Sequence, residues 1–222
     1  MGDSAVNVKQ LNLANLVSVR LSQLGDRYQA ASHLVSSAAF QVGFVRLAAG
    51  MAEWAREPDG HKQMQERLSN EQFNILMLAP VDYASRTAMT CLDLCAAAAY
   101  RLRKSGQYDA HGGRESDLDH LRNAKSHGVR LHAEQERWRA EVTGSAARSL
   151  LKRTRDIVTH RPISEYSIVG SDQPTTSIEI DGQRYDGVAL TSRFARFAET
   201  QYEAFVQAVL ADFPTNRTKT TG

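Results

Sequence analysis

Apolar residues recur at helical spacing through the first quarter of the chain. One series runs from Leu11 to Leu24, and after Gly25-Asp26 a second series continues to Trp54. Each series gives a helix one apolar face, so the pattern predicts one or two long amphipathic helices. The residues Glu57-Pro58-Asp59-Gly60 have the chemistry of a turn and predict a turn after these helices.

The segment from Ser69 to Lys104 is nearly apolar on all sides. A helix without a polar face belongs in the centre of a bundle, so this segment predicts a central helix. Pro80 lies inside it and predicts a break or kink, because proline removes one backbone hydrogen bond and clashes with the preceding turn. The glycine-containing segment from Ser105 to Glu115 predicts a loop, and a polar helix is expected to follow.

Another apolar stripe, from Trp138 to Val158, predicts a helix from Leu131 to His160. Gly144 is a weak point in this helix because glycine has a low helix propensity. Pro162 follows His160 and ends the helix.

Beyond this helix the pattern changes to alternation. Thr176 to Ile180 alternates, Asp181-Gly182 follows, and Gln183 to Tyr185 comes next, which together predict a β-hairpin. From Phe194 to Phe213 large apolar residues return to helical spacing and predict a final helix, closed by Pro214. Residues 215–222 are polar and are expected to be disordered.

These elements predict a mostly α protein, an antiparallel helical bundle with one small β-hairpin before the C-terminal helix. The 222 residues suit a single domain. Its core is expected over residues 10–162, with the hairpin and C-terminal helix over 163–214.

Composition supports a soluble globular protein, with 42% hydrophobic and 23% charged residues. No run reaches the roughly 20 apolar residues of a membrane-spanning helix, and the N-terminus lacks the basic flank and apolar core of a secretory signal. We therefore expect a cytoplasmic protein without a membrane segment. Cys91 and Cys95 lie one helical turn apart among alanines and leucines, which indicates buried thiols rather than a disulfide.

The clearest candidate for chemistry is the segment Arg155-Asp156-Ile157-Val158-Thr159-His160. On a helix, Asp156 and His160 stand at positions i and i+4, so the carboxylate can orient the imidazole and raise its basicity. Arg155 carries a permanent charge and a forked set of donors that suit a phosphate. A base beside a phosphate-binding cation indicates phosphodiester chemistry.

A basic strip surrounds this segment. From Arg148 to Arg161 there are five cations (Arg148, Lys152, Arg153, Arg155, Arg161) and one anion (Asp156), which leaves a charge of +4, whereas the whole chain carries only +2. Such a strip suits a polyanionic substrate, with Lys152, Arg153 and Arg161 as its binding residues. A solvated helix face explains the same charges equally well.

The segment on Arg155, Asp156 and His160 resembles the signature of the HEPN superfamily (higher eukaryotes and prokaryotes nucleotide-binding domains), in which an Arg, often followed by Asn, Asp or His, precedes a His by a few residues. The resemblance implies a helical, commonly dimeric domain and a metal-independent endoribonuclease of toxin–antitoxin or phage-defence systems. It also implies a composite site in which two protomers pair their motifs across one cleft. Neither a cofactor nor a metal is expected.

In some toxin members of the superfamily a tyrosine stands two residues after the His, where a partner nucleotidyltransferase modifies it. This chain has Pro162 at that position, and Tyr166 is the nearest tyrosine. The departure leaves an antitoxin partner of that type without support.

Two other segments have the same form. Arg122 to His127 matches formally, but its neighbours are polar and give it no apolar face to hold it against a core, so we favour Arg155 and His160. Arg56 to His61 spans Pro58 and Gly60 and is expected to be accidental. The remaining histidines show no metal-ligand spacing.

Two functions stay open at this point. The first is RNA cleavage, in which His160 acts as general base on a ribose 2′-hydroxyl, Arg155 stabilises the phosphorane and Asp156 orients the imidazole. The second is a non-catalytic dimeric bundle that binds RNA, a nucleotide or a partner protein.

Overall fold

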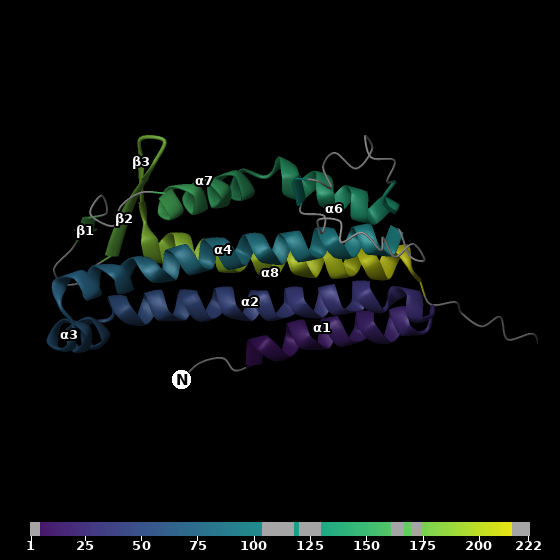
Figure 1. The fold of residues 1–222 in the computed structure, drawn as a ribbon, viewed down its shortest axis with the longest axis horizontal. Helices are drawn as coiled ribbons and strands as arrows, with labels where there is room; N and C mark the ends of the chain where they lie inside the picture. Colours follow the sequence, from purple (N-terminus) through teal and green to yellow (C-terminus); the bar gives the residue numbers. More distant parts are fainter. Residues whose placement is uncertain (1–4, 104–117, 120–129, 161–166, 170–174, 215–222) are drawn as a thin grey trace, which may run out of the picture. The chain divides into compact units, whose positions relative to one another are not determined.

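A computed structural model describes residues 5–103, 118–119, 130–160, 167–169 and 175–214. Figure 1 shows its elements. The α-helices in these ranges are α1 (Ala5–Ser22), α2 (Gln29–Arg56), α3 (Pro58–Arg67), α4 (Asn70–Arg103), α6 (Ala133–Gly144), α7 (Ala146–His160) and α8 (Gly187–Asp212), with a short 3-10 helix η1 (Asp26–Tyr28) between α1 and α2. The strands are β1 (Ser167–Val169), β2 (Thr175–Ile180) and β3 (Gln183–Asp186). The predicted fold class, a mostly α bundle with a hairpin before the C-terminal helix, is confirmed.

The chain divides into two compact units. The first comprises Met1–Phe40, Leu92–Gly144 and Gln201–Gly222, and the second comprises Gln41–Cys91 and Ser145–Thr200. Helices α2, α4 and α8 each contribute residues to both units. The expectation of a single domain stays a prediction.

In the first unit, α6 packs against the end of α8. Trp138 of α6 is buried, and its ring centroid lies 4.8 Å from that of Phe205 in α8. The Asp212 carboxylate, at the end of α8, accepts hydrogen bonds from the backbone N–H groups of Glu134 (3.2 Å) and Gln135 (3.1 Å). Since the first N–H groups of a helix lack partners within the helix, Asp212 acts as a cap from a distant part of the chain.

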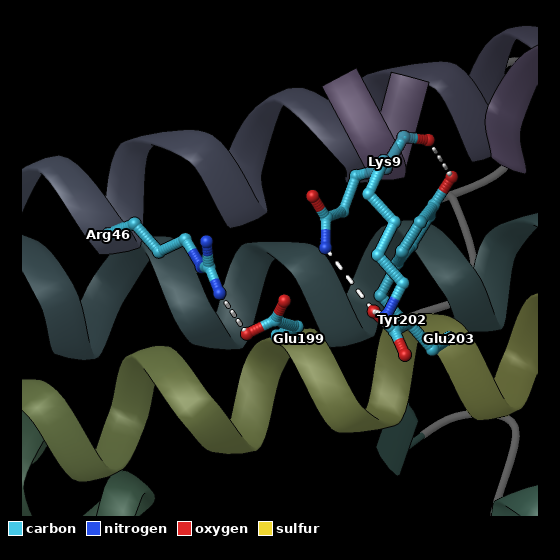
Figure 2. Close-up of polar contacts among 6 residues, drawn as sticks. Lys9, Arg46, Glu199, Tyr202 and Glu203 are labelled. Carbon is cyan, nitrogen blue, oxygen red and sulfur yellow. Dashed lines mark hydrogen bonds and ion pairs between the residues drawn. The ribbon is translucent and has the colours of Figure 1, made fainter. Parts of the chain in front are cut away.

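Helix α1 is also joined to α8 in the first unit. The Tyr202 hydroxyl is buried and donates to the Gln10 carbonyl at 3.3 Å. Lys9 Nζ lies 2.6 Å from Glu203 Oε1, and Figure 2 shows both side chains beside Tyr202. The apolar face predicted for the final helix is therefore buried here, with a polar rim of paired charges.

In the second unit, α8 meets α2 and the sheet meets α4. Arg46 Nη2 of α2 lies 2.5 Å from Glu199 Oε2 of α8 (Figure 2). The buried Thr176 hydroxyl of β2 donates to the Met77 carbonyl of α4 at 2.8 Å. A Cβ atom on Gly187 would lie 3.0 Å from the Thr176 carbonyl oxygen, so glycine allows α8 to begin close against the strand.

The predicted hairpin is confirmed. Strands β2 and β3 pair antiparallel, with Ile180 opposite Gln183 next to the turn. Asp181 has φ 52° and Gly182 has φ 77°, and two successive positive φ values are the geometry of a type I′ turn. Strand β1 adds a third antiparallel strand beside β2, which the sequence did not predict because three residues are too few to show alternation.

The predicted turn at residues 57–60 is wrong. Only Glu57 leaves the helical conformation, and Pro58 opens helix α3 at its first position. Proline fits there because its fixed φ suits a helix and its missing N–H has no partner to lose. A Cβ atom on Gly60 would lie 2.1 Å from the Trp54 carbonyl oxygen, so α3 leaves α2 by a route that needs glycine.

Pro80 does not break its helix. Helix α4 continues from Asn70 to Arg103 with Pro80 inside it. An internal proline costs about 3 kcal/mol, and the flanking residues Met77, Leu78, Val81 and Ala84 are all buried. Burial of their side chains offsets the lost hydrogen bond. Cys91 and Cys95 are buried thiols in this helix, as predicted.

The single helix predicted from Leu131 to His160 is two helices. Helix α6 ends at Gly144, the predicted weak point, and α7 begins at Ala146. The Ser145 hydroxyl between them accepts a hydrogen bond from the Arg148 N–H at 3.1 Å, which is an N-cap. The loop predicted after Ser105 and the tail 215–222 lie outside the described residues.

One segment, Asp26–Arg56, is long and apolar enough by length and composition to cross a membrane. Polar residues interrupt this segment, so a search for an unbroken apolar run does not identify it. In its most apolar window 39% of the residues are buried within the protein. The cytoplasmic location and the absence of a membrane segment stay predictions.

Candidate nucleic-acid interface

Helix α7 carries the candidate site, and its buried face fixes it to the second unit. Leu151 and Thr154 are fully buried, and Val158 is 9% exposed. The Thr154 hydroxyl donates to the Leu150 carbonyl at 2.9 Å, so this buried polar group is satisfied within the helix. The residues that face away from this core are therefore held on a supported helix, as a site requires.

The charged residues occupy two neighbouring lines on α7. A helix turns about 100° per residue, so Arg148, Lys152 and Arg155 lie along one line. Arg153 and Asp156 lie along the next line, together with the position of His160. Arg148 is only 6% exposed, whereas Arg153 is exposed and Lys152 and Arg155 are half-buried. Within the basic strip, Arg148 at the start is therefore buried, whereas the cations that follow it are more accessible to solvent.

Arg155 and Asp156 form an ion pair. Arg155 Nε and Nη2 lie 3.1 Å and 2.8 Å from Asp156 Oδ1. The two side chains are 35% and 48% exposed, so the pair is open to solvent and to a ligand. Both contacts use the same carboxylate oxygen, which leaves Oδ2 as the oxygen with which Asp156 can orient a neighbouring imidazole.

His160 is the last residue of α7, and its side chain lies outside what the structure describes. Its backbone position is four residues after Asp156 and five after Arg155. At 100° per residue, His160 shares a face with Asp156 but lies about 140° around the helix from Arg155. The backbone positions of Arg155 and His160 therefore lie on different sides of the helix, and the position of Asp156 lies between them.

Arg153 is paired with a residue that was predicted only as part of the hairpin turn and not as part of the site. It forms an ion pair with Asp181 in the hairpin turn, and the two side chains are 59% and 60% exposed. The pair joins α7 to the sheet across solvent. To contact a phosphate, Arg153 must either break its ion pair with Asp181 or bind the phosphate while it keeps that pair. Arg161 lies outside the described residues.

The rival segments differ in what the structure describes. Arg122 and His127 lie outside the described residues. Arg56 and His61 stand on either side of the junction between α2 and α3, where Arg56 lies 3.8 Å from the Asp186 carboxylate. The His61 ring meets Phe73 edge-on with a centroid distance of 5.1 Å. Each of these two residues has a structural contact of its own, and the accidental match stays a prediction.

Sequence reasoning missed an apolar groove in the second unit. It has a volume of about 220 Å³ and lies between α2, α3 and α4, and its apolar lining comprises Met51, Trp54, Met64, Leu68, Leu76 and Pro80. No element was predicted for Met64 and Leu68, and helical spacing does not show which apolar residues of the predicted helices stay exposed. Within the described part of the chain, no cluster of three or more His, Cys, Asp or Glu side chains could hold a metal ion.

Comparisons of the chain with protein-family models, with curated proteins and with solved structures found no significant match.

Proposed function

We propose that this chain is a HEPN-like, metal-independent endoribonuclease whose catalytic residues lie on α7. The observation that carries the proposal is the half-buried Arg155–Asp156 pair one helical turn before His160, on a helix whose opposite face is buried. A forked cation, a carboxylate and an imidazole at this spacing suit attack on a phosphodiester.

In the proposed reaction, His160 removes the proton from a ribose 2′-hydroxyl, whose oxygen then attacks the adjacent phosphorus. Arg155 stabilises the negative charge on the phosphorane, and Asp156 holds the imidazole. The bond to the 5′-oxygen breaks, and that oxygen takes a proton from solvent. The products are a 2′,3′-cyclic phosphate and a 5′-hydroxyl end.

The positions of Arg155 and His160 favour a site shared between two copies. The two residues of one helix are about 140° apart, so one phosphate does not fit against both by a direct approach. His160 of one protomer and Arg155 of its partner can meet across a cleft, as the resemblance to HEPN domains implies. Lys152 and Arg153 extend the charged surface of α7, and these two residues bind the flanking phosphates together with Arg161.

The proposal is tested by cleavage of a single-stranded RNA oligonucleotide in the presence of a metal chelator. We expect fragments that end in a 2′,3′-cyclic phosphate, and a rate at least 100-fold lower for Arg155→Ala because the phosphorane loses its cation. Arg137→Ala is the matched control, since Arg137 is an exposed cation of α6 paired with Glu134, and it should cleave normally. Fragments with other ends, or full activity in Arg155→Ala, contradict the mechanism.

The second candidate is a non-catalytic bundle that dimerises or binds a partner. One observation favours it: Arg153 and Arg155 already have carboxylate partners, as they would in a purely structural surface. This candidate, which binds RNA, a nucleotide or a partner protein without catalysis, predicts that the wild-type chain leaves RNA intact.

A further inference from the structure

The second half of α2 exposes large apolar side chains to solvent. Phe44, Leu47, Met51 and Trp54 are 43%, 58%, 48% and 45% exposed. Their spacing of three, four and three residues puts all four on one stripe, the spacing at which helices pack against each other. We define this stripe, together with the adjoining groove, as the α2 surface.

The charged residues beside the stripe do not interrupt it. Arg46 is held by Glu199 of α8 at 2.5 Å. Glu53 accepts a hydrogen bond from the Ser192 hydroxyl of α8 at 3.0 Å. Both charges have partners on α8, so the stripe between them is apolar and carries no charge of its own.

The α2 surface continues onto α4 across the groove. Met51 and Trp54 line the groove from α2, and Leu76 lines it from α4. Leu76 and Tyr83, two turns apart on α4, are 39% and 45% exposed. With aromatic side chains at roughly 150–250 Å² each when fully buried, the six exposed residues present on the order of 500 Å². That matches the apolar share of one side of a standard interface, about 60% of about 800 Å².

The stripe can pack against a second copy of itself that runs in the antiparallel direction. Two glycines, Gly43 and Gly50, lie beside it on the same helix. Counted from Leu47, Phe44 stands three residues before and Gly50 three residues after, while Gly43 stands four before and Met51 four after. If two copies of α2 pack antiparallel about Leu47, Leu47 faces its own copy. At 100° per residue, Phe44 and Met51 lie on one side of the seam, where each packs against the other's copy. Gly43 and Gly50 lie on the other side, where they let the two backbones approach. A Cβ atom on Gly50 would meet nothing within 4 Å, so there is space above that glycine.

We propose that the α2 surface binds the α2 surface of a second copy of this chain, with a twofold axis at Leu47. A twofold interface needs one patch that complements itself, and the stripe has that property about Leu47, with large side chains on one side of the seam and glycines on the other. The exposed apolar area of the α2 surface is that of one side of a standard interface. The spacing of the stripe suits knobs-into-holes packing of the two α2 helices.

This interface is distinct from the site on α7. In Figure 1 the second-unit parts of α4 and α8 lie between α7 and α2. A dimer formed through α2 therefore keeps the two α7 helices apart, and a cleft shared between α7 helices needs a second contact between copies. The α2 interface goes beyond the proposed function and does not depend on it.

The inference is tested by sedimentation of the full chain at tens of micromolar. Wild type should sediment as an assembly, and Leu47→Glu should halve its mass because a charge would be buried at the axis. Gly50→Leu, which places a bulky side chain where the two backbones approach, should raise the dissociation constant more than tenfold. The matched control is Val19→Glu, which changes an exposed apolar residue of α1 and should leave the mass unchanged.

Cross-linking tests the register. Leu47→Cys should form a disulfide-linked dimer on oxidation, because residue 47 faces itself across the axis. Trp54→Cys should not, because two copies of residue 54 would lie about 21 Å apart along the helices, far beyond disulfide reach. Cys91 and Cys95 are buried and should not contribute.

Three outcomes overturn the inference. The first is a monomeric wild type, and the second is an unchanged mass in Leu47→Glu. The third is a monomeric wild type that also binds lipid vesicles through Leu47, which would assign the α2 surface to a membrane. If the wild-type protein assembles as predicted but does not cleave RNA, the result contradicts the proposed function alone and leaves the α2 interface intact.

Discussion

Arg153 and Asp181 form an ion pair between α7 and the hairpin turn, and this pair competes with any phosphate that Arg153 binds. Exposed pairs of this kind contribute about 0–1 kcal/mol to stability, so breaking the pair should not affect folding. Asn also tolerates the positive φ of position 181, which is 52°.

We therefore predict that Asp181→Asn binds RNA more tightly than wild type at low salt, by roughly threefold to tenfold, because it releases Arg153 and removes a negative charge. The advantage should shrink as salt rises, since phosphate contacts are salt-dependent. Fluorescence anisotropy with a labelled oligonucleotide measures it, and Asp181→Asn combined with Arg153→Ala is the control that should lose the gain. Equal or weaker binding by Asp181→Asn would remove Arg153 from the substrate-binding set.

At the residue scale, the ion pairs could not be predicted from the sequence. The predicted partners were His160 for Asp156 and a phosphate for Arg155, whereas the structure pairs Arg155 with Asp156. The contact of Arg153 with Asp181 needs the hairpin to fold back beside α7, which no local pattern contains. The side chain of His160 lies outside the described residues, so its role stays a prediction.

Among the elements, α6 depends on a cap from α8 that is distant in sequence. The Asp212 carboxylate accepts hydrogen bonds from the N–H groups of Glu134 and Gln135. Loss of a cap costs about 0.5–2 kcal/mol.

We predict that Asp212→Ala lowers the free energy of unfolding by about 1 kcal/mol, with the same dependence on urea as wild type. Asp212→Asn should keep most of the stability, because its amide oxygen can still accept one of the bonds. Glu141→Ala, a change at an exposed residue of α6, is the control and should be near neutral. A loss in Glu141→Ala equal to that in Asp212→Ala would show that the cap is unimportant.

Helical periodicity and the Asp181-Gly182 pair predicted the main helices and the hairpin, because both are local patterns with a direct structural meaning. The errors concern proline and glycine. Pro58 has the same local chemistry in a turn as at the first position of a helix, and the structure places it in a helix. Pro80 remains inside α4 because its neighbours are buried, which depends on packing rather than on sequence.

For the whole molecule, the fold class could be predicted, and the division into two compact units could not. The apolar faces of α2, α4 and α8 run without interruption through both units, so nothing in their periodicity marks a boundary. Nor does periodicity show which apolar residues stay exposed. Phe44 and Val45 are equally apolar in sequence, yet Val45 is fully buried and Phe44 is 43% exposed.

The second unit presents two functional surfaces, one on α7 and one on α2. The α7 surface carries charge and the proposed chemistry, whereas the α2 surface is apolar and binds a second copy. Changes on one should leave the other intact, because α4 and α8 lie between them (Figure 1).

The central claim is that His160 is the general base, and paired rates of RNA cleavage for His160→Ala and His127→Ala in the presence of a chelator test it most directly. We predict that His160→Ala loses cleavage while its fold, its assembly and its RNA affinity stay near wild type, because a residue at the end of a helix contributes little to stability. His127→Ala should cleave like wild type. Loss of activity in His127→Ala alone would move the site to Arg122 and His127, and activity that survives in both variants would contradict the nuclease mechanism.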